Sequence, residues 1–266
     1  MSTESTINKV IGKIGKACGF FFVPSSKDTY LISHPRSGNS WLRSAVAEMM
    51  FGESGERLTD IYSYVPTVGF NMPVWKLKPA SFHVVRSHEY YMLNTPTEMY
   101  HRVIYIIRDP RDVALSYFRF LTQSNQYSDN FDGFLDDWLN NRIWPSSWVT
   151  HVNSWTAERS PEAMSNILIL TYDRMLSDTP GQFRRVADFL HLTLTDNAIK
   201  NIIQKTSIEQ LRKKEDRNKQ KISGFRSIQT GGVKKWKAEM TKTQAQYIVE
   251  RCGYVMSRFG FIHDDA

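Results

Sequence analysis

Disulfide chemistry is nearly absent from this chain, which has only two cysteines, Cys18 and Cys252, in 266 residues. That number is too small for a disulfide framework and favours a reducing compartment, so we predict a cytoplasmic protein. Long apolar runs are also missing, since the stretch at residues 17–23 is too short to span a bilayer and has no signal-peptide cleavage pattern. No group of side chains has metal-ligand spacing, and we therefore predict no metal.

The charge is unbalanced toward the basic side, with 34 Lys+Arg against 27 Asp+Glu and a formal net charge of +7. This excess favours an anionic partner, although solvated surface charge explains such an excess more often than nucleic-acid binding does. We expect no nucleic acid as partner. The length and an apolar content of 41% allow a sizeable core, and the simplest organisation is one α/β domain over residues 1–266. The oligomeric state stays open.

Residues 1–28 are predicted to contain an amphipathic helix and a lead-in to the domain. Apolar residues recur there at helical spacing, with lysines elsewhere around the helix: Ile7, Val10, Ile11, Ile14, Ala17 and Cys18, against Lys9, Lys13 and Lys16. A basic amphipathic helix can make a peripheral contact with a membrane surface. Packing of the helix on the domain explains the pattern equally well, and both interpretations stay open.

Short apolar segments predict strands at residues 30–32, 83–85, 103–107 and 167–170, and helical patterns begin near Ser40, Pro110 and Thr179. This alternation predicts a mostly parallel sheet covered by helices, with ligands bound beyond the carboxyl ends of the strands. The second half is predicted to be helical at residues 131–141, 147–158, 183–190, 198–204 and 243–259. Between the last two segments, residues 213–235 are basic and glycine-containing, which predicts a lid loop.

Two strand–loop–helix junctions carry the most information. The first, residues 29–43, breaks into a polar loop where Gly38 allows close approach to an anion and Asn39 or Ser40 can cap the next helix. The loop resembles the end of a nucleotide-binding P-loop, but Asn39 stands where an ATPase has its lysine. The cation of this loop is Arg36. In the second junction, residues 103–117, Arg108 leaves the strand, and Asp112 and Ser116 share one helical face.

Because helix N-termini attract anions, two such junctions predict a ligand with two separated anionic groups.

The motifs resemble those of one enzyme family in the same order along the chain. HPRSGNSW at residues 34–41 resembles the 5′-phosphosulfate loop of the sulfotransferases that use 3′-phosphoadenylyl sulfate (PAPS), and RDPRDVALSY at residues 108–117 resembles their 3′-phosphate motif. Further similar segments are VRSH at 85–88, SSWVTHVNSW at 146–155, TYD at 171–173 and KTS at 205–207. The resemblance covers roughly residues 30–236. It implies a P-loop-like central parallel sheet with flanking helices.

The resemblance also implies roles for the matched residues. Arg36 would grip the 5′-phosphosulfate and stabilise charge as the S–O bond breaks, and His88 would be the general base. Arg108 and Ser116 would hold the 3′-phosphate of PAPS, whose desulfated product is 3′,5′-ADP. The remaining expected nucleotide contacts are donors in the first loop and residues around the adenine: Ser37, Gly38, Asn39 and Ser40, and Trp41, Tyr172 and Thr206.

Three departures from the family pattern stand out. The lysine of the cytosolic members is Arg36 here, which acts by charge alone because arginine does not give up a proton. The basic segment before Trp236 is altered, so either Arg226 or Lys234 and Lys235 would complete the 3′-phosphate site, and we favour Arg226. The aromatic residue expected after the KTS segment is Ile208.

We therefore predict a PAPS-dependent sulfotransferase acting on a hydroxyl or amine of a small-molecule metabolite or natural product. A saccharide or glycolipid acceptor is the alternative, followed by a P-loop kinase or ATPase and by a non-catalytic nucleotide- or nucleic-acid-binding module. Acceptor choice is expected from residues 60–75, 89–100 and 121–130 and from the lid. The first segment mixes aromatic and apolar residues: Tyr62, Tyr64, Phe70, Met72 and Trp75.

Overall fold

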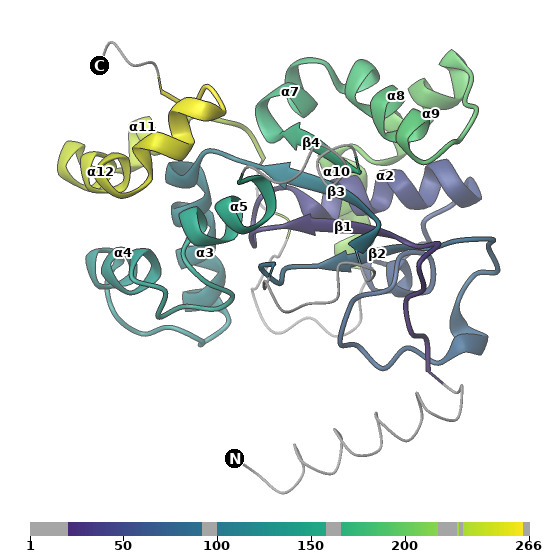
Figure 1. Ribbon diagram of the computed structural model, residues 1–266, viewed down its shortest axis with the longest axis horizontal. Coiled ribbons are helices and arrows are strands. Elements are labelled where there is room, and N and C mark those ends of the chain that lie inside the picture. Colours follow the sequence, from purple (N-terminus) through teal and green to yellow (C-terminus); the bar gives the residue numbers. More distant parts are fainter. Residues whose placement is uncertain (1–20, 92–99, 158–165, 218–227, 229–230, 263–266) are drawn as a thin grey trace, which may run out of the picture.

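The computed structural model describes residues 21–91, 100–157, 166–217, 228 and 231–262 (Figure 1). The amphipathic helix expected within residues 1–28 therefore lies mostly outside the described residues. So does Arg226, together with most of the expected lid.

The strands form a four-stranded parallel sheet in the order β2-β1-β3-β4. Their bounds are β1 Thr29–Ser33, β2 Val84–Ser87, β3 Arg102–Ile107 and β4 Ile167–Thr171. Strands β1, β3 and β4 each contain the whole of a predicted apolar segment, and β2 begins one residue after the predicted start at residue 83. The parallel sheet predicted from the alternation of strands and helices is confirmed, and all four strands end at the same edge.

Side chains alternate between the two faces of the sheet and fill two cores. Tyr30, Ile32 and Tyr105 belong to one core, which is completed by the helices α3 (Pro110–Gln123), α4 (Phe131–Leu139), α5 (Trp148–Thr156) and α12 (Lys242–Arg258). Leu31 and Ile104 belong to the other core, with α2 (Asn39–Phe51), α8 (Thr179–Phe189) and α9 (Asp196–Lys205). Figure 1 shows these two helical layers on opposite sides of the strands. The period of two follows from the pleat of a strand buried on both faces.

Helices begin close to where the sequence predicts them. Their bounds are α2 Asn39–Phe51, α3 Pro110–Gln123, α4 Phe131–Leu139, α5 Trp148–Thr156, α8 Thr179–Phe189, α9 Asp196–Lys205 and α12 Lys242–Arg258. Shorter elements are η1 Leu58–Ser63, η2 Val74–Lys76, α7 Tyr172–Ser177 and α11 Trp236–Glu239.

One boundary in the predicted lid is wrong. Helix α10, Ile208–Asp216, continues through the start of the segment expected to be a loop from residue 213. Ser207 caps this helix by accepting a hydrogen bond from the Gln210 N–H, and the buried Leu211 anchors it to the domain. Residues 213–216 are therefore helical, with Lys213 and Asp216 exposed and Glu215 buried.

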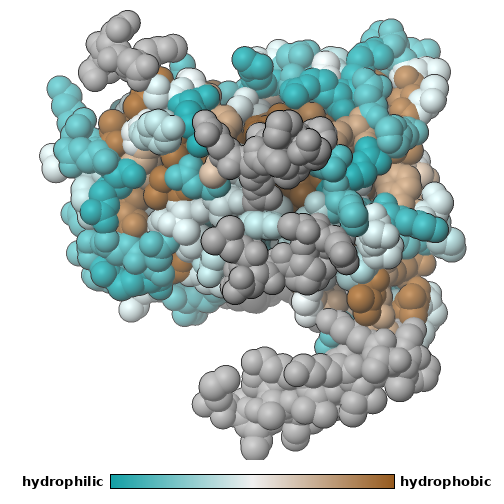
Figure 2. Space-filling view, viewed as in Figure 1, coloured by the Kyte–Doolittle hydropathy of each residue, from teal (hydrophilic) through white to brown (hydrophobic). Residues whose placement is uncertain are grey.

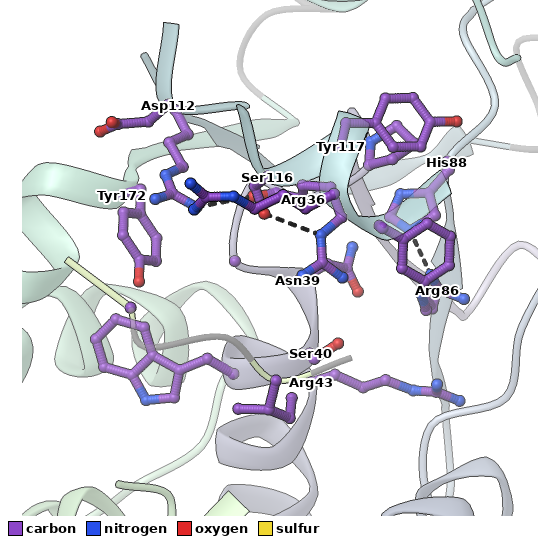
Figure 3. Close-up of a pocket in the computed structure, with 18 of the residues that line it drawn as sticks. Arg36, Asn39, Ser40, Arg43, Arg86, His88, Asp112, Ser116, Tyr117 and Tyr172 are labelled. Carbon is purple, nitrogen blue, oxygen red and sulfur yellow. Dashed lines mark hydrogen bonds between the residues drawn. The ribbon is translucent and has the colours of Figure 1, made fainter. Parts of the chain in front are cut away.

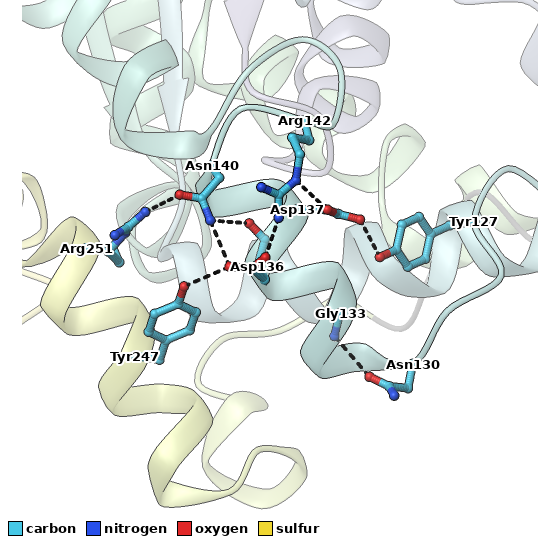
Figure 4. Close-up of polar contacts among 9 residues, drawn as sticks. All are labelled: Tyr127, Asn130, Gly133, Asp136, Asp137, Asn140, Arg142, Tyr247 and Arg251. Carbon is cyan, nitrogen blue, oxygen red and sulfur yellow. Dashed lines mark hydrogen bonds and ion pairs between the residues drawn. The ribbon is translucent and has the colours of Figure 1, made fainter.

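A polar network fastens the C-terminal helix α12 to α4 (Figure 4). The Tyr247 hydroxyl donates to Asp136 at 3.3 Å, and Arg251 donates to the side-chain oxygen of Asn140. On the α4 side, Arg142 pairs with Asp136 and with Asp137. These groups are mostly exposed, so the apolar core beneath them supplies most of the stability of this contact.

Hydrophilic side chains cover much of the surface in the view of Figure 2, with several hydrophobic areas among them. The exposed large apolar side chains of the described residues include Phe70 and Trp75, with 54% and 69% of their surface accessible. No helix within the described ranges is long and apolar enough to cross a membrane.

Candidate active site

Residues from all four strand ends line one cavity of 590 Å³. His88 follows β2, Arg36 follows β1, Arg108 follows β3 and Tyr172 follows β4. Since the strands lie in the order β2-β1-β3-β4, these side chains follow the same order along the sheet edge. Figure 3 shows His88 and Tyr172 at opposite ends with Arg36 between them. The predicted convergence at the carboxyl edge is therefore present.

The first loop reaches helix α2 through two unusual backbone conformations. Arg36 has a φ of 70° and Gly38 a φ of 100°, both in the left-handed region. A Cβ atom on residue 38 would stand 2.6 Å from the Tyr172 ring, so glycine is required by both conformation and space. Gly38 is the N-cap of α2 and no side chain caps this end, so the expected capping by Asn39 or Ser40 is wrong.

The amide of Asn39 instead donates to the Ser33 hydroxyl at 3.1 Å. The first N–H groups of α2 are thus left without a side-chain acceptor at the mouth of the cavity, where an anion can accept from them.

The Arg36 guanidinium lies at the middle of the cavity. Its Nε donates to the Ser116 hydroxyl at 3.1 Å, and its charge lies 5.1 Å from the centroid of the Phe120 ring. Burial, followed by the nearby Arg108 cation, lowers the pKa of Arg36 to about 10. The group remains a cation at neutral pH and is held where it can meet an anion.

Arg108 is fixed by backbone carbonyl groups on both sides of the cavity. Its Nη1 donates to the Arg36 carbonyl at 3.1 Å and its Nη2 to the Gly232 carbonyl at 2.9 Å, while its charge lies 4.5 Å from the Tyr172 ring centroid. The buried Nε of Arg108 has no hydrogen-bond partner among the described residues. A buried donor without an acceptor is costly, which favours an anionic ligand at this point.

Asp112 holds the segment that leads into α11 at the Arg108 end of the cavity. Its carboxylate accepts from the backbone N–H groups of Lys234 at 2.7 Å and Trp236 at 3.1 Å. Burial raises the pKa of Asp112, and the Arg108 cation opposes that rise. Arg111, which pairs with Asp109 at 2.7 Å, lies 3.8 Å from the centroid of the Trp236 ring.

His88 is held at the other end of the cavity by its backbone and its ring. Nδ1 lies 2.6 Å from the Ser33 carbonyl oxygen, and Nε2 accepts a hydrogen bond from Arg86. The His151 ring donates to the His88 carbonyl at 3.0 Å, and Tyr105 contacts the other nitrogen of His151 at 2.7 Å. Burial, and then the Arg86 cation, hold the pKa of His88 well below its usual value, so the imidazole is neutral.

The remaining predicted nucleotide contacts divide into two groups. Ser40 and Trp41 line the cavity, where the Trp41 ring meets Tyr172 edge-on at a centroid distance of 6.1 Å. Ser37 and Thr206 are fully buried behind the lining, and the Thr206 hydroxyl donates to the Ile202 carbonyl at 2.7 Å.

Arg226, or Lys234 and Lys235, were expected to complete the 3′-phosphate site. Arg226 lies outside the described residues. Lys235 lines the cavity. Lys234 contacts Asp112 through its backbone.

Two of the expected acceptor segments contribute to the cavity lining, through Ile61 and Tyr62 and through Leu121 and Gln126. Tyr64 is buried in the core and Trp75 is exposed. Residues 92–99 of the third segment lie outside the described residues. Sequence reasoning missed other lining residues near His88: Arg43, Arg86, Tyr117, Phe120 and Trp144. Arg43 was predictable from the sequence. It lies three residues after Ser40 and four after Asn39, so all three share one face of α2.

No group of three or more His, Cys, Asp or Glu side chains within the described part of the chain is arranged to hold a metal ion.

Comparison with known proteins identifies the family. A model described as "Sulfotransferase domain" matches residues 26–260. The chain is 23% identical to 3-alpha-hydroxysteroid sulfotransferase of Cavia porcellus over 249 residues, covering 85% of this chain and 82% of the relative. It is 24% identical to amine sulfotransferase of Oryctolagus cuniculus over 236 residues, covering 82% and 77%.

Two solved structures share the fold. Mouse sulfotransferase SULT7A1 complexed with PAP superposes with a TM-score of 0.66 at 20% identity and covers 90% of both chains. Retinol dehydratase in complex with androsterone and the inactive cofactor PAP superposes with a TM-score of 0.69 at 22% identity, covering 86% of this chain and 82% of the other. The chain therefore belongs to the sulfotransferase family, and the prediction of a PAPS-dependent sulfotransferase enzyme is confirmed.

Proposed function

We propose that this enzyme moves the sulfuryl group of PAPS to a hydroxyl or amine of a small-molecule acceptor, with His88 as the general base. The observation that carries this proposal is the order of His88, Arg36 and Arg108 along one sheet edge and in one cavity. It gives a proton acceptor at one end, a cation in the middle and a second cation at the other end. A donor with two anionic groups and a separate acceptor fit that order.

The nucleotide belongs at the Arg108 end. Arg108 and Ser116 would hold the 3′-phosphate, because the buried Nε of Arg108 lacks a partner among the described groups and the arginine fork matches a phosphate. Arg36 and the uncapped N–H groups of α2 would hold the 5′-phosphosulfate. Trp41 and Tyr172 would flank the adenine, and Ser37, Gly38, Asn39, Ser40 and Thr206 would support this end. Lys235 or Arg226 would add the second basic group.

The residues supply positioning and charge rather than covalent chemistry. As the acceptor oxygen or nitrogen bonds to sulfur and the bridging S–O bond breaks, Arg36 stabilises the charge that develops on the departing phosphate oxygen. His88 Nε2, which accepts a hydrogen bond from Arg86 in this structure, takes the acceptor proton once the acceptor group has replaced that contact. A neutral imidazole, kept so by burial, suits that role.

A small acceptor is supported by the mixed lining near His88. Ile61, Phe120, Leu121 and Trp144 give the cavity apolar lining, and the Trp144 ring meets the His88 ring edge-on at a centroid distance of 6.1 Å. The named relatives act on a hydroxysteroid and on amines, both of which are small molecules. A saccharide or glycolipid acceptor remains the alternative, and the cytoplasmic location remains a prediction.

The donor site is tested by the rise in melting temperature that a ligand produces when it binds the folded state alone. We expect 3′,5′-ADP to stabilise the enzyme more than 5′-AMP at equal concentration, with an affinity about tenfold to hundredfold higher because of the 3′-phosphate contacts. Arg108→Ala should remove the preference. Arg174→Ala, which removes an exposed arginine from the neighbouring helix α7, should retain it. Equal stabilisation by both nucleotides would overturn the placement of the 3′-phosphate.

A further inference from the structure

Two arginines that face the acceptor end of the cavity have no carboxylate partner among the described residues. Arg43 exposes only 5% of its surface, and Arg86 is half-buried. Both line the cavity beside His88 (Figure 3). The ion pairs of the described residues include neither arginine. Arginines this deeply placed are usually paired with an acid.

Arg43 is held firmly in this position by neutral groups. Its Nε donates to the Val65 carbonyl at 2.9 Å and its Nη2 donates to the same oxygen. Its charge lies 4.5 Å from the centroid of the Tyr62 ring, and Tyr62 in turn stacks on Phe70 at 5.1 Å. The guanidinium is therefore preorganised, and its orientation does not depend on a ligand.

Arg86 is held from the opposite side, by β2. Its backbone N–H donates to the Pro66 carbonyl at 2.8 Å, and its Nη2 donates to His88 Nε2. Burial and then the Arg86 cation lower the pKa of Arg43 to about 9, so the Arg43 guanidinium lies within electrostatic reach of Arg86. Two like charges in a site with an apolar wall are stabilised by an anion that lies between them.

We propose that the acceptor carries a carboxylate or a similar oxyanion, bound by Arg43 and Arg86, in addition to the hydroxyl or amine that receives the sulfuryl group. This inference rests on the proposed function and names its substrate class. The Nε and Nη2 of Arg43 already donate to the Val65 carbonyl, so its Nη1, together with the Arg86 guanidinium, would donate to the oxygens of a carboxylate. The apolar residues that line the same cavity, among them Phe120 and Leu121, would contact the body of an amphiphilic acid.

The charge of the nucleotide does not account for the pair. Arg36, Arg108 and the start of α2 already form the anion site proposed for the donor, and Ser116 and Tyr172 lie on that side. Arg43 and Arg86 lie on the His88 side of the cavity (Figure 3), where the acceptor belongs.

The test uses the enzyme saturated with 3′,5′-ADP, so that the donor site is filled. Calorimetric titrations compare 3-phenylpropanoate, phenyl phosphate and the neutral 3-phenylpropanamide as probes. We expect an anion to bind at least tenfold more tightly than the amide, with the carboxylate favoured over the phosphate if the natural group is planar. Arg43→Gln should weaken anion binding about 30-fold or more, because it leaves the partner charge buried and unpaired.

Arg184→Gln is the matched control, because it removes an equally charged but exposed side chain from α8. It should leave anion binding unchanged. If Arg43→Gln does not fold, Arg86→Gln tests the same pair from the more exposed side. Equal binding of anion and amide, or anion binding that neither substitution weakens, would overturn the inference. Failure of 3′,5′-ADP itself to bind would instead overturn the proposed function, so the two failures are distinguishable.

Discussion

The Nδ1 atom of His88 lies 2.6 Å from the carbonyl oxygen of Ser33. A carbonyl oxygen only accepts, so this contact places the imidazole proton on Nδ1 and leaves on Nε2 the lone pair that accepts from Arg86. Ser33 is the last residue of β1, and His88 comes directly after β2, the neighbouring strand. The pairing of two parallel strands therefore sets the tautomer of the proposed base.

Replacing this histidine separates proton transfer from nucleotide binding. We expect His88→Gln to lower kcat by about 10²–10⁴-fold, because the amide cannot take the acceptor proton. Binding of 3′,5′-ADP should stay close to that of the unchanged enzyme, since His88 lies at the opposite end of the cavity from Tyr172. Formation of 3′,5′-ADP from PAPS over a panel of hydroxyl and amine acceptors measures the first quantity, and thermal stabilisation measures the second. A variant with undiminished turnover would remove His88 from the mechanism.

The pH dependence of the reaction should report the buried state of His88. A base acts in its deprotonated form, so kcat/KM falls in acid only below the pKa of the base. Since burial and the Arg86 cation hold the pKa of His88 well below 6.5, kcat/KM should be level between pH 8 and pH 6.5 and fall at lower pH. The imidazoles of His34 and His151 lie nearby and act on His88 in the same direction as Arg86.

Removing the Arg86 charge raises the pKa of His88, so Arg86→Gln should move the acid limb of kcat/KM upward by about one pH unit. Arg119→Gln is the control, because it removes an exposed cation that lines the same cavity and pairs with Glu239. Its acid limb should coincide with that of the unchanged enzyme. If the acid limb of kcat/KM lies at the same pH in Arg86→Gln as in the unchanged enzyme, the limb reports the titration of a group other than His88.

Much of this site follows from local sequence patterns. The β-branched runs locate the strands, and the rule that parallel strands end at one edge brings Arg36, Arg108 and His88 together. Tyr172 follows from the same rule, because it comes directly after β4. These predictions succeed because each depends on a strand and the few residues that follow it.

Contacts between distant segments were not predictable in the same way. Asp112 accepts from Lys234, which is 122 residues away, and nothing in either local pattern indicates the partner. The position of the Arg43 guanidinium depends on how the Val65 carbonyl folds against α2. The missing cap of α2 was also unexpected, because Asn39 satisfies Ser33 instead of the helix end.

The two ends of helix α2 offer a matched pair of glycines. Gly38 and Gly52 both have left-handed φ angles, 100° and 70°, but a Cβ on residue 38 would meet the Tyr172 ring at 2.6 Å whereas one on residue 52 would meet nothing within 4 Å. Gly52→Ala should cost about 1–2 kcal/mol of unfolding free energy from backbone conformation alone. Gly38→Ala should cost about 1–3 kcal/mol more from the clash.

Displacement of the loop or of Tyr172 should also weaken 3′,5′-ADP binding in Gly38→Ala but not in Gly52→Ala. Denaturant unfolding and nucleotide titration give the two quantities. Equal losses of stability in the two variants would mean that Tyr172 moves aside without cost.

Asp112 should control the order of the segment that closes the nucleotide end. Its carboxylate is the acceptor for two backbone N–H groups, those of Lys234 and Trp236. In Asp112→Ala both amides lose their acceptor, and we expect their hydrogen exchange to accelerate at least tenfold, because a hydrogen bond to a charged group contributes about 1.5–3 kcal/mol. Asp132→Ala, which removes a surface acceptor of the Gln244 side chain, is the control and should leave these amides unchanged.

Binding of 3′,5′-ADP should restore part of the protection in Asp112→Ala, because the nucleotide would bring a second set of contacts to the same segment through Arg108, which already donates to Gly232. Exchange that is as slow in Asp112→Ala as in the unchanged enzyme would show that the cation–π contact between Arg111 and Trp236 is sufficient to hold the segment.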